Sequence, residues 1–168
     1  MTAHKSDIES AVSILLTPGG LDLNALDAGL GYAMGAGIDY ADLYFQRTWQ
    51  EGWVLEDGEV KEASYNIDGG VGVRSLAGEK TGFAYSNQIT ADALMDTGRT
   101  ASGIVRSGKQ LPGQKVMPVS AASYYAGIDP LAGLSAEDKV AMLKEADRVA
   151  RAADPSISQV SASLSGTY

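Results

Sequence analysis

The chain has 168 residues, of which 45% are hydrophobic and 20% are charged. This composition is typical of a globular protein, and the length fits one domain, or a domain plus an appended hairpin, rather than several. The sequence contains no cysteine and one histidine, which excludes disulfide scaffolds, thiol enzymes, Ser-His-Asp hydrolases and any metal site that needs two histidines. The net charge of −8 argues against general nucleic-acid binding and against an anionic membrane surface as partner.

Membrane and export segments are not expected from the hydrophobicity pattern. No apolar run approaches the roughly 20 residues that span a bilayer. The apolar stretch Ile8–Leu16 is interrupted by Glu9, and no small-residue cleavage motif follows it. We therefore expect no signal peptide and a cytoplasmic location.

The first segment, residues 6–37, has helical periodicity. Ser6 and Glu9 have the spacing of a capping box, and apolar residues then recur every three or four positions. Pro18-Gly19-Gly20 is expected to end this helix, and a second helix is expected to begin near Asp22. The inward side of the second helix is expected to contain Leu23, Leu26, Leu30 and Ala33.

The second segment, residues 39–86, changes to the period of two that is typical of strands. Three of the four junctions between its strands are short turns: Asp57-Gly58, which is the strongest hairpin motif in the chain, Asp68-Gly69-Gly70, and Ala77-Gly78. Strands joined by turns this short run antiparallel, because a parallel return needs a crossover of about a dozen residues or more. The segment therefore predicts a meander of five strands, at about 43–48, 53–55, 60–67, 71–76 and 81–85.

The third segment predicts two helices and a last strand. Thr90 is expected to cap a helix that ends near Val105, with Leu94, Ala101 and Ile104/Val105 facing inward. Residues 107–123 are expected to form a polar connection. Ser135 is expected to cap a helix that runs to about Ala153. Residues 157–168 alternate again and predict a strand that pairs back onto the meander. In the helix that Ser135 caps, Lys139 is expected to face outward. The inward face of this helix is expected to contain Met142, Leu143, Ala146, Val149 and Ala150.

Together these elements predict an α+β fold, with an antiparallel meander sheet of about five to six strands and helices packed on one face. We expect a single domain over residues 1–168. Its parts are helices at 6–37, the sheet at 39–86, helices and a connection at 90–153, and a final strand at 157–168.

Two patterns in the sheet segment suggest binding, each with a structural alternative. The glycine-rich Gly69–Gly72 could cradle phosphate, but Ser75 stands where a dinucleotide fingerprint needs its third glycine, so a turn is favoured. Aromatic side chains could form a groove for a peptide or a stacking platform, although cross-strand packing is the simpler interpretation. These aromatic residues are Tyr44, Trp49, Trp53, Tyr65, Phe83 and Tyr85.

Two charged clusters are also open to two interpretations. A carboxylate pair could carry out acid–base hydrolysis, but a solvated sheet rim is favoured for Glu51, Glu56, Asp57, Glu59 and Glu62. A local basic stretch could contact an acidic partner, but it is more simply solvated. This stretch consists of Arg99, Arg106, Lys109 and Lys115.

Six strings, in order, resemble the N-terminal region of the TldD/PmbA family of cytoplasmic bacterial and archaeal zinc metallopeptidases. The strings are Asp39–Gln46, Trp53–Gly58, Ser64–Arg74, Glu79–Ser86, Asp129–Leu131 and Ser161–Gly166. The resemblance spans nearly the whole chain and is closer to the TldD-type subunit than to its PmbA (TldE)-type partner.

This resemblance implies a peptidase that cleaves small or unfolded peptides together with a PmbA/TldE-like subunit. It also implies zinc bound by a His-Glu-x-x-x-His helix with a glutamate base, a motif that this chain lacks. The family carries that motif in a C-terminal region, so we expect this chain to contain no catalytic, cofactor-binding or metal-binding residue and to be inactive alone. Its expected role is a scaffold that shapes the substrate channel and contacts the other subunit. The expected substrate-adjacent or structural surface contains Gly69, Gly70, Gly72, Arg74, Tyr65 and Phe83.

An alternative function is a free-standing α+β module that binds a protein partner through its sheet edge without catalysis. A further alternative is a small hydrolase that uses Glu56, Asp57 and Glu59. Neither alternative requires a metal or a nucleic acid.

Overall fold

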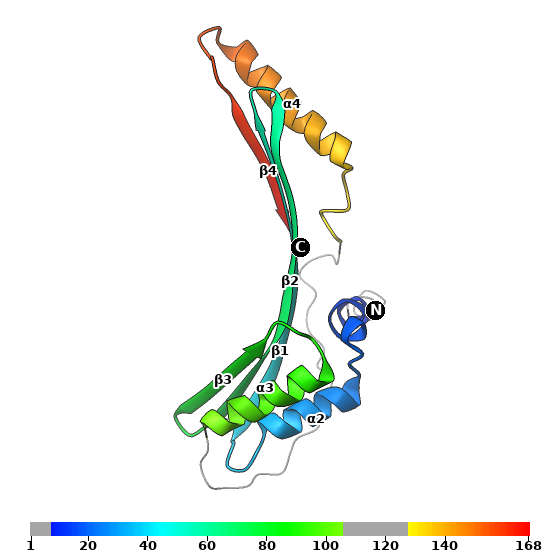
Figure 1. Cartoon of the computed structure of the whole chain (residues 1–168), viewed down its shortest axis with the longest axis vertical. Coiled ribbons are helices and arrows are strands. Elements are labelled where there is room, and N and C mark those ends of the chain that lie inside the picture. The colour runs from blue at the N-terminus through cyan, green and yellow to red at the C-terminus, as the bar shows by residue number, and fades with distance from the viewer. Residues whose placement is uncertain (1–7, 106–127) are drawn as a thin grey trace, which may run out of the picture. The chain divides into compact units, whose positions relative to one another are not determined.

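The computed structural model describes residues 8–105 and 128–168 (Figure 1). In this part of the chain the protein is α+β, as predicted, with one antiparallel sheet in the strand order β3-β2-β1-β4. The strands are β1 (Tyr40–Glu56), β2 (Glu59–Ala77), β3 (Lys80–Ser86) and β4 (Ser161–Thr167). The helical elements are η1 (Val12–Leu16), η2 (Thr17–Gly19), α2 (Leu23–Ala33), α3 (Ala91–Ile104) and α4 (Ala136–Ala153). Ser6, the predicted connection 107–123 and three residues of the basic stretch, Arg106, Lys109 and Lys115, lie outside the described residues.

The prediction of five to six strands is wrong, because two pairs of predicted strands are continuous and the described sheet has four. β1 contains the first two predicted strands, and β2 contains the third and fourth. The predicted turn at Asp68-Gly69-Gly70 lies inside β2. A Cβ at Gly70 would lie 2.4 Å from the backbone oxygen of Ser86. Glycine is therefore needed here for the close approach of another backbone, which is its usual role inside a strand.

The described chain divides into two compact units, and the single domain expected over residues 1–168 stays a prediction. The first unit contains residues 8–47 and 69–105 of the described chain. The second contains Thr48–Asp68 and Ile128–Tyr168. Both β1 and β2 contribute residues to each unit.

In the first unit the two helix starts predicted from capping residues are confirmed. The Asp22 carboxylate accepts a hydrogen bond from the Ala25 amide at 2.8 Å, and the Thr90 hydroxyl accepts one from the Ala93 amide at 3.3 Å. Each bond satisfies an amide that the first turn of a helix leaves unpaired. The helices α2 and α3 then pack side by side against one face of the sheet (Figure 1).

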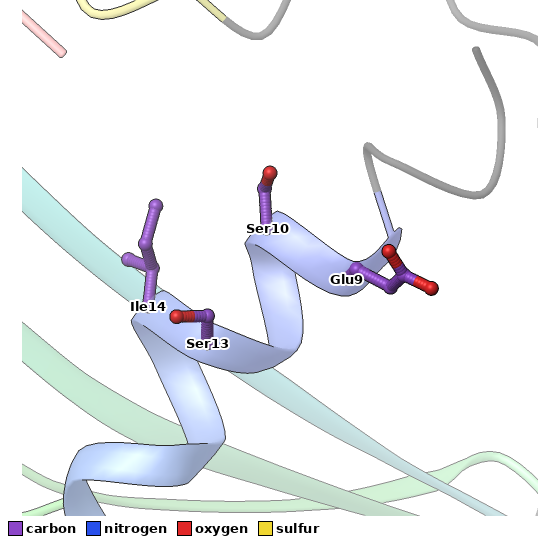
Figure 2. Close-up of a pocket in the computed structure, with 4 residues that line it drawn as sticks. All are labelled: Glu9, Ser10, Ser13 and Ile14. Atoms are coloured by element: carbon purple, nitrogen blue, oxygen red, sulfur yellow. The ribbon is translucent and has the colours of Figure 1, made fainter.

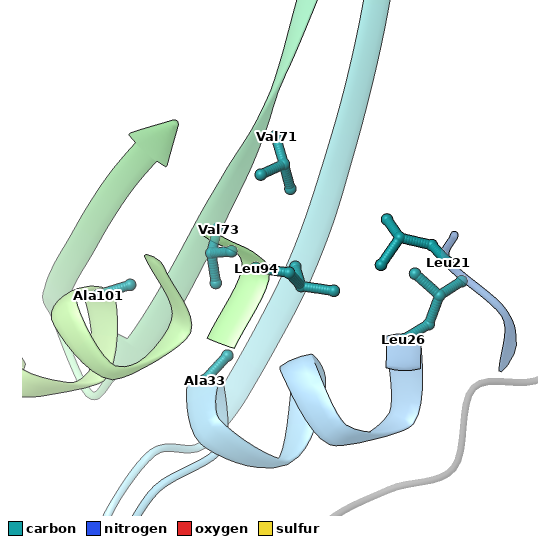
Figure 3. Packing of buried hydrophobic residues seen from close by; sticks show 7 residues of the cluster. All are labelled: Leu21, Leu26, Ala33, Val71, Val73, Leu94 and Ala101. Carbon is teal, nitrogen blue, oxygen red and sulfur yellow. The ribbon is translucent and has the colours of Figure 1, made fainter. Parts of the chain in front are cut away.

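The core of this unit lies between α2, α3 and the sheet (Figure 3). Its buried residues are Leu21, Leu26, Ala33, Val71, Val73, Leu94 and Ala101. The predicted inward positions of Leu26, Ala33, Leu94 and Ala101 are confirmed. Leu23 and Ile104 are instead 62% and 59% exposed, although Leu21 and Val105 close to them in the sequence are buried, so these two side chains point away from the packed side of their helices.

One polar residue links the sheet to α2, and one glycine allows α2 and α3 to approach each other closely. The buried Ser75 of β2 donates a hydrogen bond from its hydroxyl to the Ala33 carbonyl at the end of α2, at 2.8 Å. A Cβ at Gly98 of α3 would lie 2.9 Å from the backbone oxygen of Gly29 of α2. The two helices therefore touch backbone to backbone, a packing that a larger side chain at either glycine would prevent.

In the second unit the predicted hairpin turn is confirmed. Asp57 and Gly58 join β1 to β2 with positive φ values of 50° and 78°, which a two-residue type I′ turn requires. β4 pairs antiparallel with β1, from Gln50 opposite Thr167 to Glu56 opposite Ser161. This strand is shorter than the predicted range of 157–168.

The predicted start of α4 is confirmed, and of its predicted inward face Leu143 is buried as expected. The Ser135 hydroxyl accepts a hydrogen bond from the Asp138 amide at 3.1 Å, and Asp138 completes a capping box. Its buried residues are Lys139, Leu143 and Asp147. The predicted inward residues Met142 and Val149 are each 52% exposed. Charged residues can occupy the inward face because Lys139 pairs with Glu51 of β1 and Asp147 pairs with Arg151 of α4 itself.

Candidate functional site

Three of the six residues expected to form a substrate-adjacent surface come together in the first unit. Antiparallel pairing places Arg74 of β2 opposite Phe83 of β3, and Gly72 opposite Tyr85. Their side chains lie on the sheet face opposite to the one that carries the buried Val71 and Val73, because strand side chains alternate. We call this exposed side the open sheet face and define it by Asp42, Tyr44, Gly72, Arg74, Phe83 and Tyr85.

An ion pair between neighbouring strands lies on the open sheet face. The Arg74 Nε donates a hydrogen bond to Asp42 Oδ2 at 3.1 Å, and the Nη2 group also contacts this oxygen. The side chains of Arg74 and Asp42 are 49% and 31% exposed. The hydrogen bond with Asp42 raises the pKa of the Arg74 guanidinium, so the arginine is charged at any working pH. It can offer its remaining donors to a carboxylate or to a peptide carbonyl of a bound chain.

Aromatic rings cover the rest of the open sheet face. Phe83 and Tyr85 are 57% and 78% exposed, and their ring centroids lie 6.5 Å apart in a stacked arrangement. A Cβ at Gly72 would lie 3.1 Å from Cε2 of Phe83, so the Phe83 ring rests against the glycine. Tyr44 is 61% exposed on the neighbouring strand β1. Phe83 and Tyr85 belong to the same strand, and the three rings are open to solvent rather than packed under helices.

The other three expected residues lie elsewhere. Gly69 and Gly70 are inside β2, where each approaches a neighbouring backbone closely. Tyr65 belongs to the second unit and is 58% exposed. Within the first unit the structure thus brings Gly72, Arg74 and Phe83 together, while Tyr65 belongs to the second unit.

The carboxylate cluster predicted on the second and third strands does not have the electrostatics of a general acid. Hydrogen bonds from Lys139 and then Trp53 lower the pKa of Glu51. A hydrogen bond from the Val160 amide and another from Arg151 lower the pKa of Asp57, and Lys61 does the same for Glu59. A general acid at neutral pH needs a raised carboxyl pKa. These three groups are instead held as anions, which favours the structural interpretation.

The contact that sequence reasoning missed is the buried pair of Lys139 and Glu51. Lys139 Nζ lies 2.7 Å from Glu51 Oε1, and the two side chains are 9% and 13% exposed. Lys139 also donates to the Leu131 carbonyl at 3.0 Å, and Trp53 Nε1 donates to Glu51 at 2.5 Å. All these polar groups are satisfied, so the cluster is structural. No local sequence pattern joins residues so far apart in the chain.

Among the described residues no metal centre and no membrane-crossing helix is found. Among them no three histidine, cysteine or acidic side chains gather where they could hold a metal ion. A shallow pocket near the N-terminus is lined by Glu9, Ser10, Ser13 and Ile14, without a histidine or a cation (Figure 2). No helix in the described ranges has both the length and the apolar character to cross a bilayer.

Family models match most of the described chain. Residues 41–105 match the model described as PmbA/TldA metallopeptidase domain 1, and residues 129–168 match the PmbA/TldA metallopeptidase central domain. A Metalloprotease TldD homolog from Haemophilus influenzae is 45% identical over 156 residues, which is 92% of this chain and 32% of that relative. The chain belongs to the PmbA/TldD family and spans about a third of the length of this relative.

Two solved structures share the fold at low sequence identity. A protein from Bacteroides thetaiotaomicron, named as a proposed modulator of DNA gyrase, has a TM-score of 0.60 and 20% identity, over 88% of this chain and 35% of that one. TldE from Thermococcus kodakarensis has a TM-score of 0.57 and 15% identity, over 86% of this chain and 32% of that one. At these identities the likeness concerns the fold alone.

Proposed function

We propose that this chain provides the N-terminal part of a cytoplasmic TldD-type zinc metallopeptidase that cleaves small or unfolded peptides. The observation that supports this proposal best is the 45% identity to a Metalloprotease TldD homolog, over nearly the whole chain but only about a third of that relative. In this proposal the chain shapes the peptide channel and contacts a TldE-like subunit. The catalytic groups belong to the part of the enzyme that the matched third does not include.

The residues of this chain do not fit a zinc site. The sequence has one histidine and no cysteine, and its described acidic side chains form no cluster of three that could hold a metal ion. Protein zinc sites use sets of histidine, cysteine and carboxylate ligands. In the proposed enzyme the metal and the general base are therefore contributed from outside this chain, and no catalytic step is assigned to its residues.

The open sheet face is the proposed contribution of this chain to the peptide channel. Its aromatic rings offer apolar contact area with little conformational entropy to lose. Arg74 provides fixed positive charge beside them, held in place by Asp42. Such a surface suits backbone carbonyls and apolar side chains of an unfolded peptide more than it suits a folded protein.

A chimera tests this proposal. The chain would replace the matched third of the Haemophilus influenzae relative, and peptidase activity on an unfolded protein would be measured with a TldE-type subunit present. We expect the chimera to be active, a version without this third to be inactive, and the isolated chain to be inactive and free of stoichiometric zinc after dialysis. Activity or stoichiometric zinc in the isolated chain would contradict the proposal, as would an inactive but folded chimera.

Two variants separate the channel role from a general structural role. In the active chimera, Arg74→Ala and Phe83→Ala should raise KM for the unfolded substrate with little change in kcat, because they remove contact area rather than reacting groups. Glu79→Ala is the matched control, since Glu79 is exposed in the first unit and lies in the turn before β3. If the chimera stays inactive while the isolated chain captures a protein partner, the alternative of an interaction module without catalysis holds instead.

A further inference from the structure

One edge of the sheet in the second unit is open along much of its length. The sheet order gives β2 two neighbours, β1 and β3, and β3 pairs only with Val71–Ala77. In the described chain no strand therefore pairs with the outer edge of Glu59–Ile67. Every residue of this segment except Ser64 is exposed. An edge strand of this kind presents backbone N–H and C=O groups to any extended chain that approaches it.

The two halves of this edge segment differ in chemistry. Glu59, Lys61 and Glu62 bring charge to the first half, which is the usual protection of an edge against uncontrolled pairing. The second half, Ala63–Ile67, carries no charge. Within it Tyr65 and Ile67 are 58% and 53% exposed. The unprotected half of the edge thus combines open backbone groups with apolar side chains, as strand-addition sites do.

The charge of the second unit indicates what can pair there. Its residues include 12 aspartates and glutamates against five lysines and arginines, so it carries a net charge of −7 out of the −8 of the whole chain. On the edge itself Glu59 is paired with Lys61 at 2.7 Å, while Glu62 forms no ion pair among the described residues. A second copy of this chain would bring like charge to the same edge. A basic segment would be attracted to it.

We propose that the outer edge of β2 over Glu59–Ile67 binds an extended, basic segment of another polypeptide by strand addition. Backbone hydrogen bonds supply the affinity, Tyr65 and Ile67 contact apolar side chains of that segment, and Glu62 contacts its lysines or arginines. This surface lies in the second unit, whereas the open sheet face lies in the first. The inference does not depend on the proposed peptidase function, and its test measures binding rather than proteolysis.

The test uses the full chain and labelled peptides of about ten residues, the length of a long strand. One peptide alternates valine and lysine, a second alternates valine and glutamate, and a third is the lysine peptide with alternate backbone nitrogens methylated. We expect the lysine peptide to bind at least about tenfold more tightly than the glutamate peptide, and more weakly in about 0.5 M salt. Methylation should abolish binding because it removes the donors of the strand ladder. Equal binding of the methylated peptide would overturn strand addition, and equal binding of the glutamate peptide would overturn the preference for a basic partner.

Substitutions test whether the peptide binds at Glu59–Ile67. Glu62→Lys and Tyr65→Lys should each weaken binding of the lysine peptide by about tenfold or more, the effect of removing an attraction and adding a like charge. Glu79→Lys makes the same charge change as Glu62→Lys, but in the first unit, and should leave binding of the lysine peptide unaltered. All three should keep the thermal unfolding profile of the parent chain, because the substituted side chains are exposed. Loss of binding in Glu79→Lys, or unchanged binding in both edge variants, would contradict the placement of the site on Glu59–Ile67. Self-association of the chain that Tyr65→Lys abolishes would also contradict the proposal, because the edge would then bind a second copy.

Discussion

Lys139 Nζ lies 2.7 Å from Glu51 Oε1, although 88 residues separate the two positions in the chain. Both side chains are nearly buried, and the pair joins α4 to β1 within the second unit. Leu131 and Trp53 complete the cluster with one hydrogen bond each. Burying two charges has a desolvation cost, which the pair offsets only because every polar atom has a partner.

Removing one partner of this pair should therefore be strongly destabilising. We expect Lys139→Met to lower the free energy of unfolding by about 3 kcal/mol, because it leaves the Glu51 carboxylate buried without its cation. The double variant Lys139→Met/Glu51→Leu should recover much of the loss. Arg148→Met is the matched control on α4. Its partner Glu145 is 58% exposed, so this exposed pair should contribute less than about 1 kcal/mol. Urea unfolding of the four proteins checks the ordering, and equal losses in Lys139→Met and Arg148→Met would refute it.

The same pair predicts a pH dependence. The hydrogen bonds from Lys139 and Trp53 lower the pKa of Glu51 below its ordinary value of 4.5. A carboxyl whose pKa is lowered by folding stabilises the protein fully above the unfolded-state pKa, and that contribution is lost as pH falls through the folded-state pKa. We expect the stability of the parent chain to fall below about pH 4.5. Glu51→Gln should be less stable at neutral pH and should lose less on acidification. Identical pH profiles for the two proteins would show that Glu51 is not responsible.

Local chemistry along the sequence was sufficient to predict the ends of helices and the hairpin. Asp22, Thr90 and Ser135 cap helices as expected, since a cap depends only on residues within the next turn. The Asp57-Gly58 turn is equally local, because its two positive φ values suit these residues. The register of Arg74 against Phe83 follows from the tight turn that joins β2 to β3.

Features set by distant contacts could not be read from the sequence. Gly69-Gly70 was interpreted as a turn because glycine serves turns and close backbone approaches alike, and nothing nearby indicates the Ser86 backbone. The inward face of α4 was misjudged in part for a similar reason. Lys139 is buried because the distant Glu51 neutralises it, whereas a hydrophobicity pattern assigns a lysine to the surface. Asp147 pairs with Arg151 one turn further along α4, a local ion pair that a hydrophobicity pattern also overlooks. On the open sheet face, the pairing of Arg74 with Asp42 was likewise missed.

The close approach at Gly70 gives a direct prediction. Gly70→Ala should destabilise the chain by about 1–3 kcal/mol, because a Cβ would lie 2.4 Å from the Ser86 backbone oxygen and a strand must shift to admit it. Gly31→Ala is the opposite case, since Gly31 lies in α2 with nothing within 4 Å of the added Cβ. That change should stabilise the chain by up to about 1 kcal/mol through helix propensity. Thermal and urea unfolding of both variants test this difference. If Gly70→Ala left the stability unchanged, Gly70 would accept a side chain, as a turn position can, and the close approach to Ser86 would be refuted.

The last prediction concerns Asp57, which combines two roles in the hairpin turn of the second unit. Its φ of 50° is a conformation that most residues avoid. Its Oδ1 accepts hydrogen bonds from Arg151 Nη2 at 2.6 Å and from the Val160 amide at 3.2 Å, which links the turn to α4 and to the segment before β4. Asparagine keeps an acceptor and tolerates positive φ, glycine keeps only the conformational freedom, and alanine keeps neither.

We therefore expect Tm to fall least in Asp57→Asn and most in Asp57→Ala, with Asp57→Gly between them. The Val160 amide and then Arg151 lower the pKa of the Asp57 carboxyl, so the parent should lose its advantage over Asp57→Asn as pH falls below about 3.8. Thermal unfolding of the four proteins at neutral and acidic pH measures both effects. If Asp57→Gly matched or exceeded the parent at neutral pH, relief of the positive φ would outweigh the two hydrogen bonds, and Asp57 would act through turn geometry alone.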